Sequence, residues 1–113
     1  MEFKYFLQNV KLTSNDKEEI RKKLNKLNKY AVDIWEAKLD LSYNESHNTY
    51  ERFRIEVNLK LPNKLIRSEE READLQDGLD KVVDELGRQI RKYKGYKESK
   101  RRKARRKAKK GEF

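Results

Sequence analysis

Residues 53–61 read Phe-Arg-Ile-Glu-Val-Asn-Leu-Lys-Leu, and this stretch decides the fold. Apolar side chains alternate with polar ones, which is the pattern of a strand with one face in the core and the other in water. Residues 35–43 show the same alternation, because the apolar period changes from 3.6 to 2 near Asp33. The two stretches predict strands whose apolar faces another layer must cover.

Two predicted helices can supply that layer. Apolar side chains at spacings of 3 and 4 predict one helix over about residues 14–30, capped by Thr13, and another from about residue 74 to residue 94. The first seam is Ile20, Leu24, Leu27 and Ala31, and the second is Leu75, Leu79, Val82, Leu86 and Ile90. Gly78 and Gly87 each cost a helix about 1 kcal/mol relative to alanine. The second helix therefore needs tertiary support, and its small residues would allow a close approach to a sheet.

The remaining strands complete the topology. Alternation over Phe3, Tyr5 and Leu7 predicts a short first strand, and residues 65–71 predict a fourth after a turn at Pro62-Asn63. A right-handed crossover makes the first two strands parallel, and short connections make the last three antiparallel. The predicted fold class is α+β: a two-layer sandwich in the order β-α-β-β-β-α, with two helices on one face of a four-stranded mixed sheet.

Charge divides the chain unevenly. Its 113 residues suit a single domain, and a composition of 35% apolar and 44% charged residues leaves little material for a large buried cofactor site. Residues 1–87 hold 18 acidic and 16 basic side chains, whereas residues 88–113 hold 14 basic and 2 acidic ones. We therefore predict a folded domain over residues 1–96 and a basic, flexible C-terminal tail over residues 97–113.

No pattern in the sequence points to catalysis. There is no cysteine, and the single histidine, His47, lies in a polar turn without partners for a metal site. Carboxylates at Glu36, Asp40 and Glu56 alternate with cations on the predicted polar sheet face, so we interpret them as cross-strand charge pairs. We expect no catalytic residue, no metal and no cofactor. Because catalytic patterns are missing, we predict that the protein is not an enzyme. The sequence shows neither a signal peptide nor a membrane span, so we predict a cytoplasmic location.

The basic residues indicate a polyanionic partner. Arg88, Arg91 and Lys92 recur at i, i+3 and i+4, which places them in one stripe on the second helix. Candidate phosphate ligands are Lys22, Lys23, Lys26 and Lys29 on the first helix, Arg88, Arg91, Lys92 and Lys94 on the second, and Lys100, Arg101, Arg102 and Lys103 in the tail. Two such helices side by side would form a wide positive surface. We favour nucleic acid over an acidic membrane surface or an acidic protein.

Two aromatic positions allow two interpretations each. Trp35 begins the inward face of its strand, so we expect it in the core or at its edge, although it could also stack on a nucleotide. Tyr93 and Tyr96 lie among cations, as in many nucleic-acid-binding segments, but Tyr93 could equally close the last turn of the helix over the core. A compact body without a helix-turn-helix pattern favours structured RNA over DNA.

Several segments resemble one known family. Residues 65–75 read Leu-Ile-Arg-Ser-Glu-Glu-Arg-Glu-Ala-Asp-Leu, and residues 78–94 read Gly-Leu-Asp-Lys-Val-Val-Asp-Glu-Leu-Gly-Arg-Gln-Ile-Arg-Lys-Tyr-Lys. Together with Asn-Val-Lys-Leu-Thr at residues 9–13 and Lys-Leu-Asn-Lys-Leu-Asn-Lys-Tyr at residues 23–30, they resemble the ribosome hibernation-promoting factors, also called ribosome-associated inhibitors. The resemblance covers about residues 3–97, and the fold of that family has the same β-α-β-β-β-α order.

The resemblance implies a specific function. Such proteins bind the small ribosomal subunit and its ribosomal RNA in the channel for messenger RNA and transfer RNA, and thereby inhibit translation without turnover. The RNA-contacting cations of the family match Lys23 and Lys26 here, together with Arg88, Arg91, Lys92 and Lys94. Long members carry a further C-terminal domain that pairs two ribosomes. Residues 65–94 look most like those members, so we expect pairing only if the native protein includes such a domain.

Two rival functions remain open. A generic double-stranded-RNA-binding module shares the α-β-β-β-α order, although the leading strand and the parallel crossover argue against it. A small RNA-processing enzyme would need a metal or an acid–base set, and the sequence offers neither.

Overall fold

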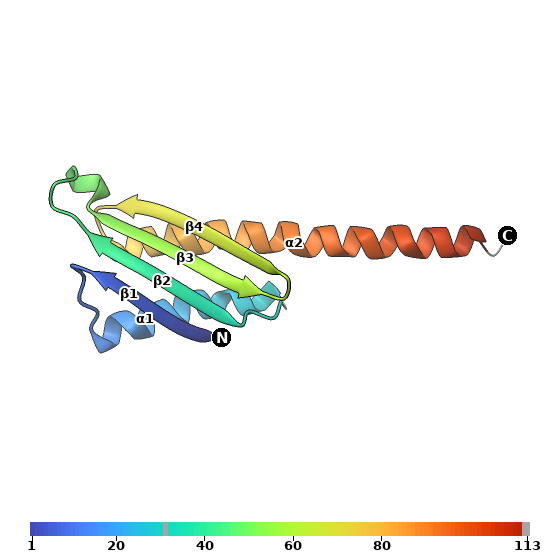
Figure 1. Ribbon diagram of the computed structural model, residues 1–113, viewed down its shortest axis with the longest axis horizontal. Coiled ribbons are helices and arrows are strands. Elements are labelled where there is room, and N and C mark those ends of the chain that lie inside the picture. The colour runs from blue at the N-terminus through green and yellow to red at the C-terminus, as the bar shows by residue number, and fades with distance from the viewer. Residues whose placement is uncertain (31, 112–113) are drawn as a thin grey trace.

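The computed structural model in Figure 1 describes the backbone of residues 1–30 and 32–111, with side chains for residues 1–30 and 32–95. The predicted α+β order is confirmed. The elements are β1 (Glu2–Gln8), α1 (Ser14–Asn25), the 3₁₀ helix η1 (Lys26–Tyr30), β2 (Glu36–Tyr43), the 3₁₀ helix η2 (Thr49–Glu51), β3 (Phe53–Leu61), β4 (Lys64–Glu72) and α2 (Leu75–Gly111).

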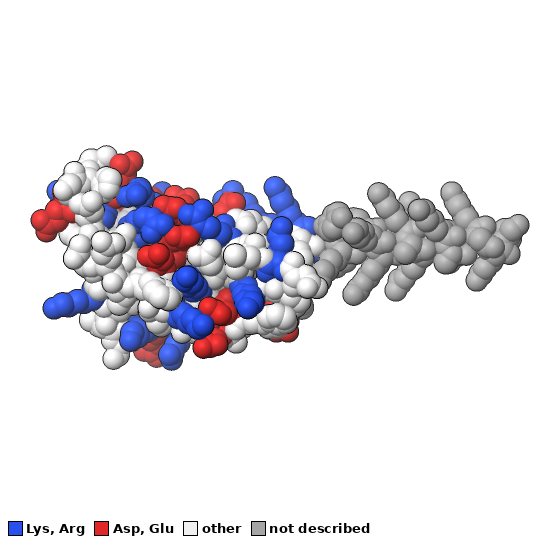
Figure 2. Space-filling view, viewed as in Figure 1, with Lys and Arg blue, Asp and Glu red and all other residues white. Residues whose placement is uncertain are grey.

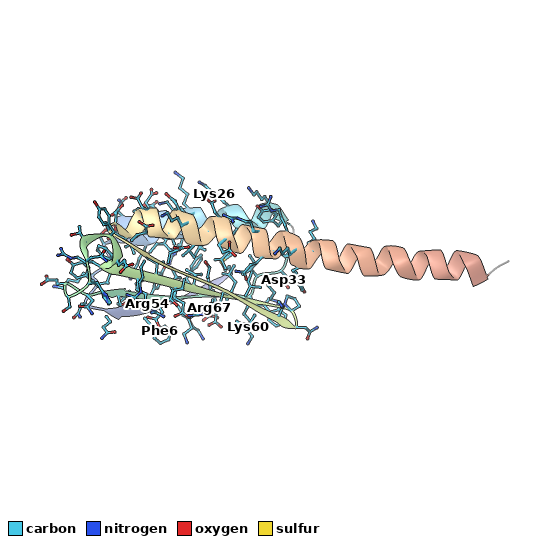
Figure 3. The ribbon with its side chains drawn as sticks, turned by 90° about the horizontal axis from the view of Figure 1, so that it is seen from above. Phe6, Lys26, Asp33, Arg54, Lys60 and Arg67 are labelled. Atoms are coloured by element: carbon cyan, nitrogen blue, oxygen red, sulfur yellow. The ribbon has the colours of Figure 1, made fainter. Side chains whose placement is uncertain are left out.

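The sheet has the order β1-β2-β3-β4 that the connections predict. β1 is parallel to β2, whereas β2–β3 and β3–β4 are antiparallel, with Leu39 opposite Val57 and Val57 opposite Ser68. Both long helices lie on one side of the sheet (Figures 1 and 3). The other side, which we call the open face, carries the polar half of each alternating strand.

The core lies between the sheet and the helices, where both helical seams meet the apolar strand residues. Its buried side chains are Ile20, Leu24, Leu27, Ile34, Ala37, Leu39, Leu41, Ile55, Val57, Leu59, Leu61, Ile66, Leu79, Val82, Leu86 and Ile90. Every apolar residue of β3 from Ile55 onward is thus buried, as its alternation predicts. Burial at about 25 cal/mol per Å² of apolar surface is the main force holding the two layers together.

The first helix begins as predicted and ends differently. The backbone amide of Asp16 donates to Thr13 Oγ1 at 3.1 Å, and the amide of Thr13 donates to Asp16 Oδ2 at 3.0 Å, so the capping box is complete. The α-helix then stops at Asn25 and continues as the tighter η1. Asparagine is unfavourable in helix interiors, which suits an end of the α-helix at Asn25. The 3₁₀ turns still bring Leu27 into the core.

Gly78 allows α2 to lie close to β3. A Cβ atom at this position would stand 2.3 Å from Ile55 Cδ1, far inside van der Waals contact. Gly87 has a milder role, since its Cβ would stand 3.1 Å from the Tyr30 hydroxyl on η1. The predicted close approach is therefore confirmed, and Gly78 marks its tightest point.

Gly78→Ala is expected to destabilise the domain by about 1 kcal/mol, because overpacking at a buried contact outweighs the gain in helix propensity. Chemical denaturation of single and double variants measures this. In an Ile55→Val background, which removes Cδ1, the same substitution should become neutral or stabilising. An equal loss in both backgrounds would contradict the assignment of the clash to Ile55.

The apolar seam predicts that the second helix ends near residue 94, but the helix is longer. Its backbone continues without a break to Gly111 and projects beyond the sheet (Figure 1). Past Gly95 the sequence is rich in Lys and Arg, which are good helix formers, and it contains no proline. The division between a domain over 1–96 and a tail over 97–113 stays a prediction, but helical backbone crosses that boundary. No described helix is long and apolar enough to span a membrane.

Trp35 does not lie in the core. It precedes β2 and is 50% exposed, so the predicted core or core-edge packing is wrong. Its backbone still extends the sheet, since its amide donates to the Lys60 carbonyl at 2.8 Å. The indole Nε1 instead donates to Asp33 Oδ2 at 2.7 Å. Ile34, the preceding residue, is buried in its place.

Candidate nucleic-acid interface

The α1–η1 segment packs beside α2. Lys23 Nζ lies 3.0 Å from Asp80 Oδ1 and donates to Gln76 Oε1 at 2.6 Å. Further along both helices, the Tyr30 ring lies against Gly87. The later residue of the first segment contacts the later residue of α2, so the two helices run roughly parallel. They lie side by side, as the sequence predicts.

Six predicted cations are exposed on these helices and define what we call the basic helical face. They are Lys22, Lys26, Lys29, Arg88, Arg91 and Lys92. Lys26 points away from the sheet in Figure 3. Only Arg88 has a carboxylate partner among the described residues, a loose pair of 3.6 Å with Glu85. Such an exposed pair contributes little stability, so the guanidinium can exchange Glu85 for a phosphate.

The positive charge is concentrated at one end of the face. The start of α2, up to Asp84, carries exposed acids at Asp77, Asp80 and Asp84, whereas no acid occurs between Arg88 and Lys94. Negative charge near a helix N-terminus suits the helix dipole, whereas the cations at Arg88, Arg91 and Lys92 lie near the middle of α2. The arrangement gives a polyanion one end of the helical layer to bind.

Lys23 and Lys94 differ from the other predicted ligands. The Lys23 side chain is only 16% exposed and is held by Asp80 and Gln76, so its ammonium joins α1 to α2. Lys94 is half-buried. Lys100, Arg101, Arg102 and Lys103 lie outside the residues whose side chains are described, as does Tyr96. Their role in binding stays a prediction.

Tyr93 takes the packing position of its two predicted alternatives. Its ring packs against the core, and its hydroxyl donates to the Pro62 carbonyl at 3.1 Å. The contact ties α2 to the β3–β4 turn, where Asn63 adopts a positive φ of 59°. Tyr93 therefore fixes the direction of the helix that carries Arg91 and Lys92.

Charge pairs cover the centre of the open face, as predicted. Figure 2 shows basic and acidic side chains interleaved over the strands. Arg54 Nε donates to Glu69 Oε1 at 2.7 Å and its Nη1 lies 3.7 Å from Asp40, while Glu56 accepts from both Arg54 and Arg67. Glu36 pairs with Lys4 at 3.5 Å. These carboxylates are engaged in a cross-strand network.

Glu56 is the centre of this network. The hydrogen bond from Arg67, supported by Asn58 and Arg54, lowers the pKa of Glu56 below its usual value of 4.5, although burial acts in the opposite direction. The pKa of the partner Arg54 shifts as well. Burial tends to lower the pKa of Arg54, but its bonds to Glu69 and Glu56 outweigh that effect and raise it.

A lowered pKa in the folded state makes stability depend on pH in a defined direction. The stability that ionised Glu56 contributes is fully present above pH 4.5 and is lost as the pH falls through its folded-state pKa. Glu56→Gln is expected to cost about 1–2 kcal/mol near neutrality and to flatten the fall in stability below pH 4.5. Denaturation curves from neutral to acid pH measure both effects. An unchanged acid profile would show that Glu56 is not the titrating group.

The described residues contain no group of three or more His, Cys, Asp or Glu side chains able to hold a metal ion. His47 Nε2 lies 3.4 Å from Arg71 Nη1 at the edge of the open face. One feature of that face was missed from sequence, a hollow beside Trp35 and the β3–β4 turn. Its only sequence signal is the polar, basic turn that follows β3.

The chain matches known proteins over most of its length. Residues 4–98 match the family described as Sigma 54 modulation protein / S30EA ribosomal protein. Ribosome hibernation promotion factors of Deinococcus radiodurans and Staphylococcus aureus (strain COL) are 38% and 35% identical over 87 and 86 residues, or 77% and 76% of this chain. The matches cover 46% and 44% of those proteins, so the chain spans about half the length of the curated relatives it matches.

Solved structures share the fold. The N-terminal domain of Thermus thermophilus Protein Y has a TM-score of 0.71 at 30% identity, with 82% of this chain and 99% of that domain aligned. A ribosomal subunit interface protein from Coxiella burnetii has a TM-score of 0.69 at 21% identity, over 84% of this chain and 99% of that one, and supports the fold alone. The predicted resemblance is confirmed: this chain belongs to the Sigma 54 modulation protein / S30EA ribosomal protein family.

Proposed function

We propose that this chain is a ribosome hibernation domain that binds the small ribosomal subunit through ribosomal RNA and inhibits translation without catalysis. The basic helical face is the observation that carries the proposal. Arg88, Arg91 and Lys92 project from the middle of α2, and Lys26 and Lys29 project from the neighbouring η1. The name of the curated relatives, ribosome hibernation promotion factor, supports a ribosomal partner.

The mechanism is steric. RNA is commonly recognised through its shape and phosphates, and a rigid two-layer body needs only phosphate contacts to stay bound in a groove. We place the domain in the channel of messenger RNA and transfer RNA, where occupancy itself prevents initiation. Such binding requires no metal, cofactor or bond rearrangement. It implies a cytoplasmic protein, and pairing of ribosomes would need a domain beyond this one.

A generic double-stranded-RNA-binding module is the main alternative. It would bind any duplex through phosphates and 2′-hydroxyls across successive minor grooves. The charge-paired open face and the single basic end of the helical layer favour a local, shape-dependent contact.

Co-sedimentation with purified small subunits tests the proposal. The protein should migrate with small subunits in dilute salt, separate from them in concentrated salt, and inhibit translation in a cell-free system. Each neutralised phosphate should steepen the log–log dependence of affinity on salt by about 0.7–0.9. Equal affinity for small subunits and for an arbitrary RNA duplex would instead support the generic module. A protein that stays apart from ribosomes in dilute salt would refute both the partner and the mechanism.

A further inference from the structure

A hollow of about 760 Å³ lies on the open face, on the far side of the sheet from the basic helical face. Trp35, Leu61 and the exposed Leu65 provide its apolar lining, and Asn63, Lys60 and Lys64 are among the polar residues around them. Lys60 points away from the helical layer in Figure 3, opposite to Lys26. The hollow is therefore separate from the site already described.

The charges around this hollow are unbalanced. Among the described residues, no carboxylate lies within ion-pair distance of Lys60 or Lys64. The two carboxylates that line the hollow already have partners: Glu36 pairs with Lys4, and Glu56 accepts from Arg54 and Arg67. The available charge is thus positive, and an anionic ligand complements it.

The aromatic group narrows the class of anion. Trp35 leaves half of its surface exposed, and Asp33 fixes its indole through the Nε1 hydrogen bond. An exposed, oriented ring beside free ammonium groups is the combination that holds single-stranded nucleic acid, since a base stacks on the ring while phosphates meet the cations. A duplex cannot use such a site, because its bases are already stacked on one another.

We propose that this hollow binds an unpaired nucleotide of single-stranded RNA, with the base stacked on Trp35 and the adjacent phosphates contacted by Lys60 and Lys64. The inference goes beyond the proposed function, because it adds a second RNA contact on the opposite face of the domain. It does not depend on binding to the small subunit. A domain with both surfaces can contact RNA on two sides at once.

Intrinsic fluorescence can isolate this site, because the chain contains a single tryptophan. Titration with a short oligouridylate in dilute salt should quench Trp35 emission in a saturable manner. Lys60→Ala combined with Lys64→Ala should weaken the quenching affinity by about 25-fold at roughly 0.1 M salt, since each single-strand phosphate contact contributes a salt exponent near 0.7. Lys11→Ala with Lys17→Ala removes the same charge elsewhere and should leave the affinity within about twofold.

The controls separate this site from the basic helical face. Alanine at Arg88, Arg91 and Lys92 should leave the Trp35 quenching intact even if it abolishes binding to small subunits. Oligouridylate containing 4-thiouridine should crosslink to the peptide that holds Trp35. Quenching by polyglutamate at the same concentration would assign the hollow to acidic proteins instead. Equal quenching by duplex RNA, no quenching at all, or crosslinks confined to α2 would overturn the proposal.

Discussion

Replacing Arg88, Arg91 and Lys92 with alanine should weaken binding to small ribosomal subunits by roughly 10²–10³-fold at about 0.1 M salt. Each phosphate contact to a structured RNA carries a salt exponent of up to about 0.9, so the loss of one contact costs about eightfold at that concentration. All three side chains are exposed, and the only carboxylate partner found for them among the described residues is Glu85. The fold should therefore survive their removal with little change in stability.

The measurement is the affinity for small subunits across a salt series. The slope of log affinity against log salt should become shallower by about 2–3 when the three contacts are lost. A matched variant with alanine at Lys4, Lys11 and Lys17 removes the same charge from exposed positions outside the basic helical face. It should lose far less affinity. Equal losses in both variants would mean that net charge, and not this face, directs binding.

Leu86→Ala should produce the largest loss of folding stability, about 3–4 kcal/mol. Leu86 is completely buried on α2, at the interface with the sheet. Truncating a buried leucine removes apolar contacts and leaves a cavity that a packed interior refills only in part. Because domains of this size are stable by only about 5–15 kcal/mol in total, the change should shift the denaturation midpoint strongly.

Chemical denaturation at neutral pH checks this effect. Leu65→Ala is the matched control, since the same truncation at a side chain that is 64% exposed should change stability by less than about 0.5 kcal/mol. A loss below about 1 kcal/mol for Leu86→Ala would contradict the packing of α2 described above. The variant should also lose binding to small subunits, whereas the alanine variant of the basic helical face should lose binding and remain folded.

The alternating and helical periods were sufficient to predict the fold. Residues 53–61 and the seam from Leu75 to Ile90 leave one arrangement that buries both patterns, and the structure has it. Trp35 was misplaced because strict alternation was extended one residue beyond the start of β2. At that point Ile34 fills the core and the indole finds Asp33 instead. Periodicity fails at this strand end, although the Trp35 backbone still bonds to the sheet.

The shared face of the candidate cations could be predicted from the sequence, but the contacts that some of them make could not. Spacing places Arg88, Arg91 and Lys92 on one helix surface without tertiary information. It cannot reveal that Lys23 reaches across to Asp80 and Gln76, because that contact joins segments 53 and 57 residues apart in the chain. The hollow at Trp35 was missed for a similar reason, since residues of β2, β3 and the β3–β4 turn meet only in the folded sheet.

The unbroken backbone of α2 from Leu75 to Gly111 sets a fixed spacing along the domain. Its 37 residues advance by about 1.5 Å each, or about 55 Å in all. A partner bound to the outer turns is therefore held at a fixed distance and rotation from a partner bound to the inner turns. Inserting one residue past Gly95 would turn the outer segment by about 100° relative to the sheet, whereas inserting a full heptad would restore its heading while lengthening its reach.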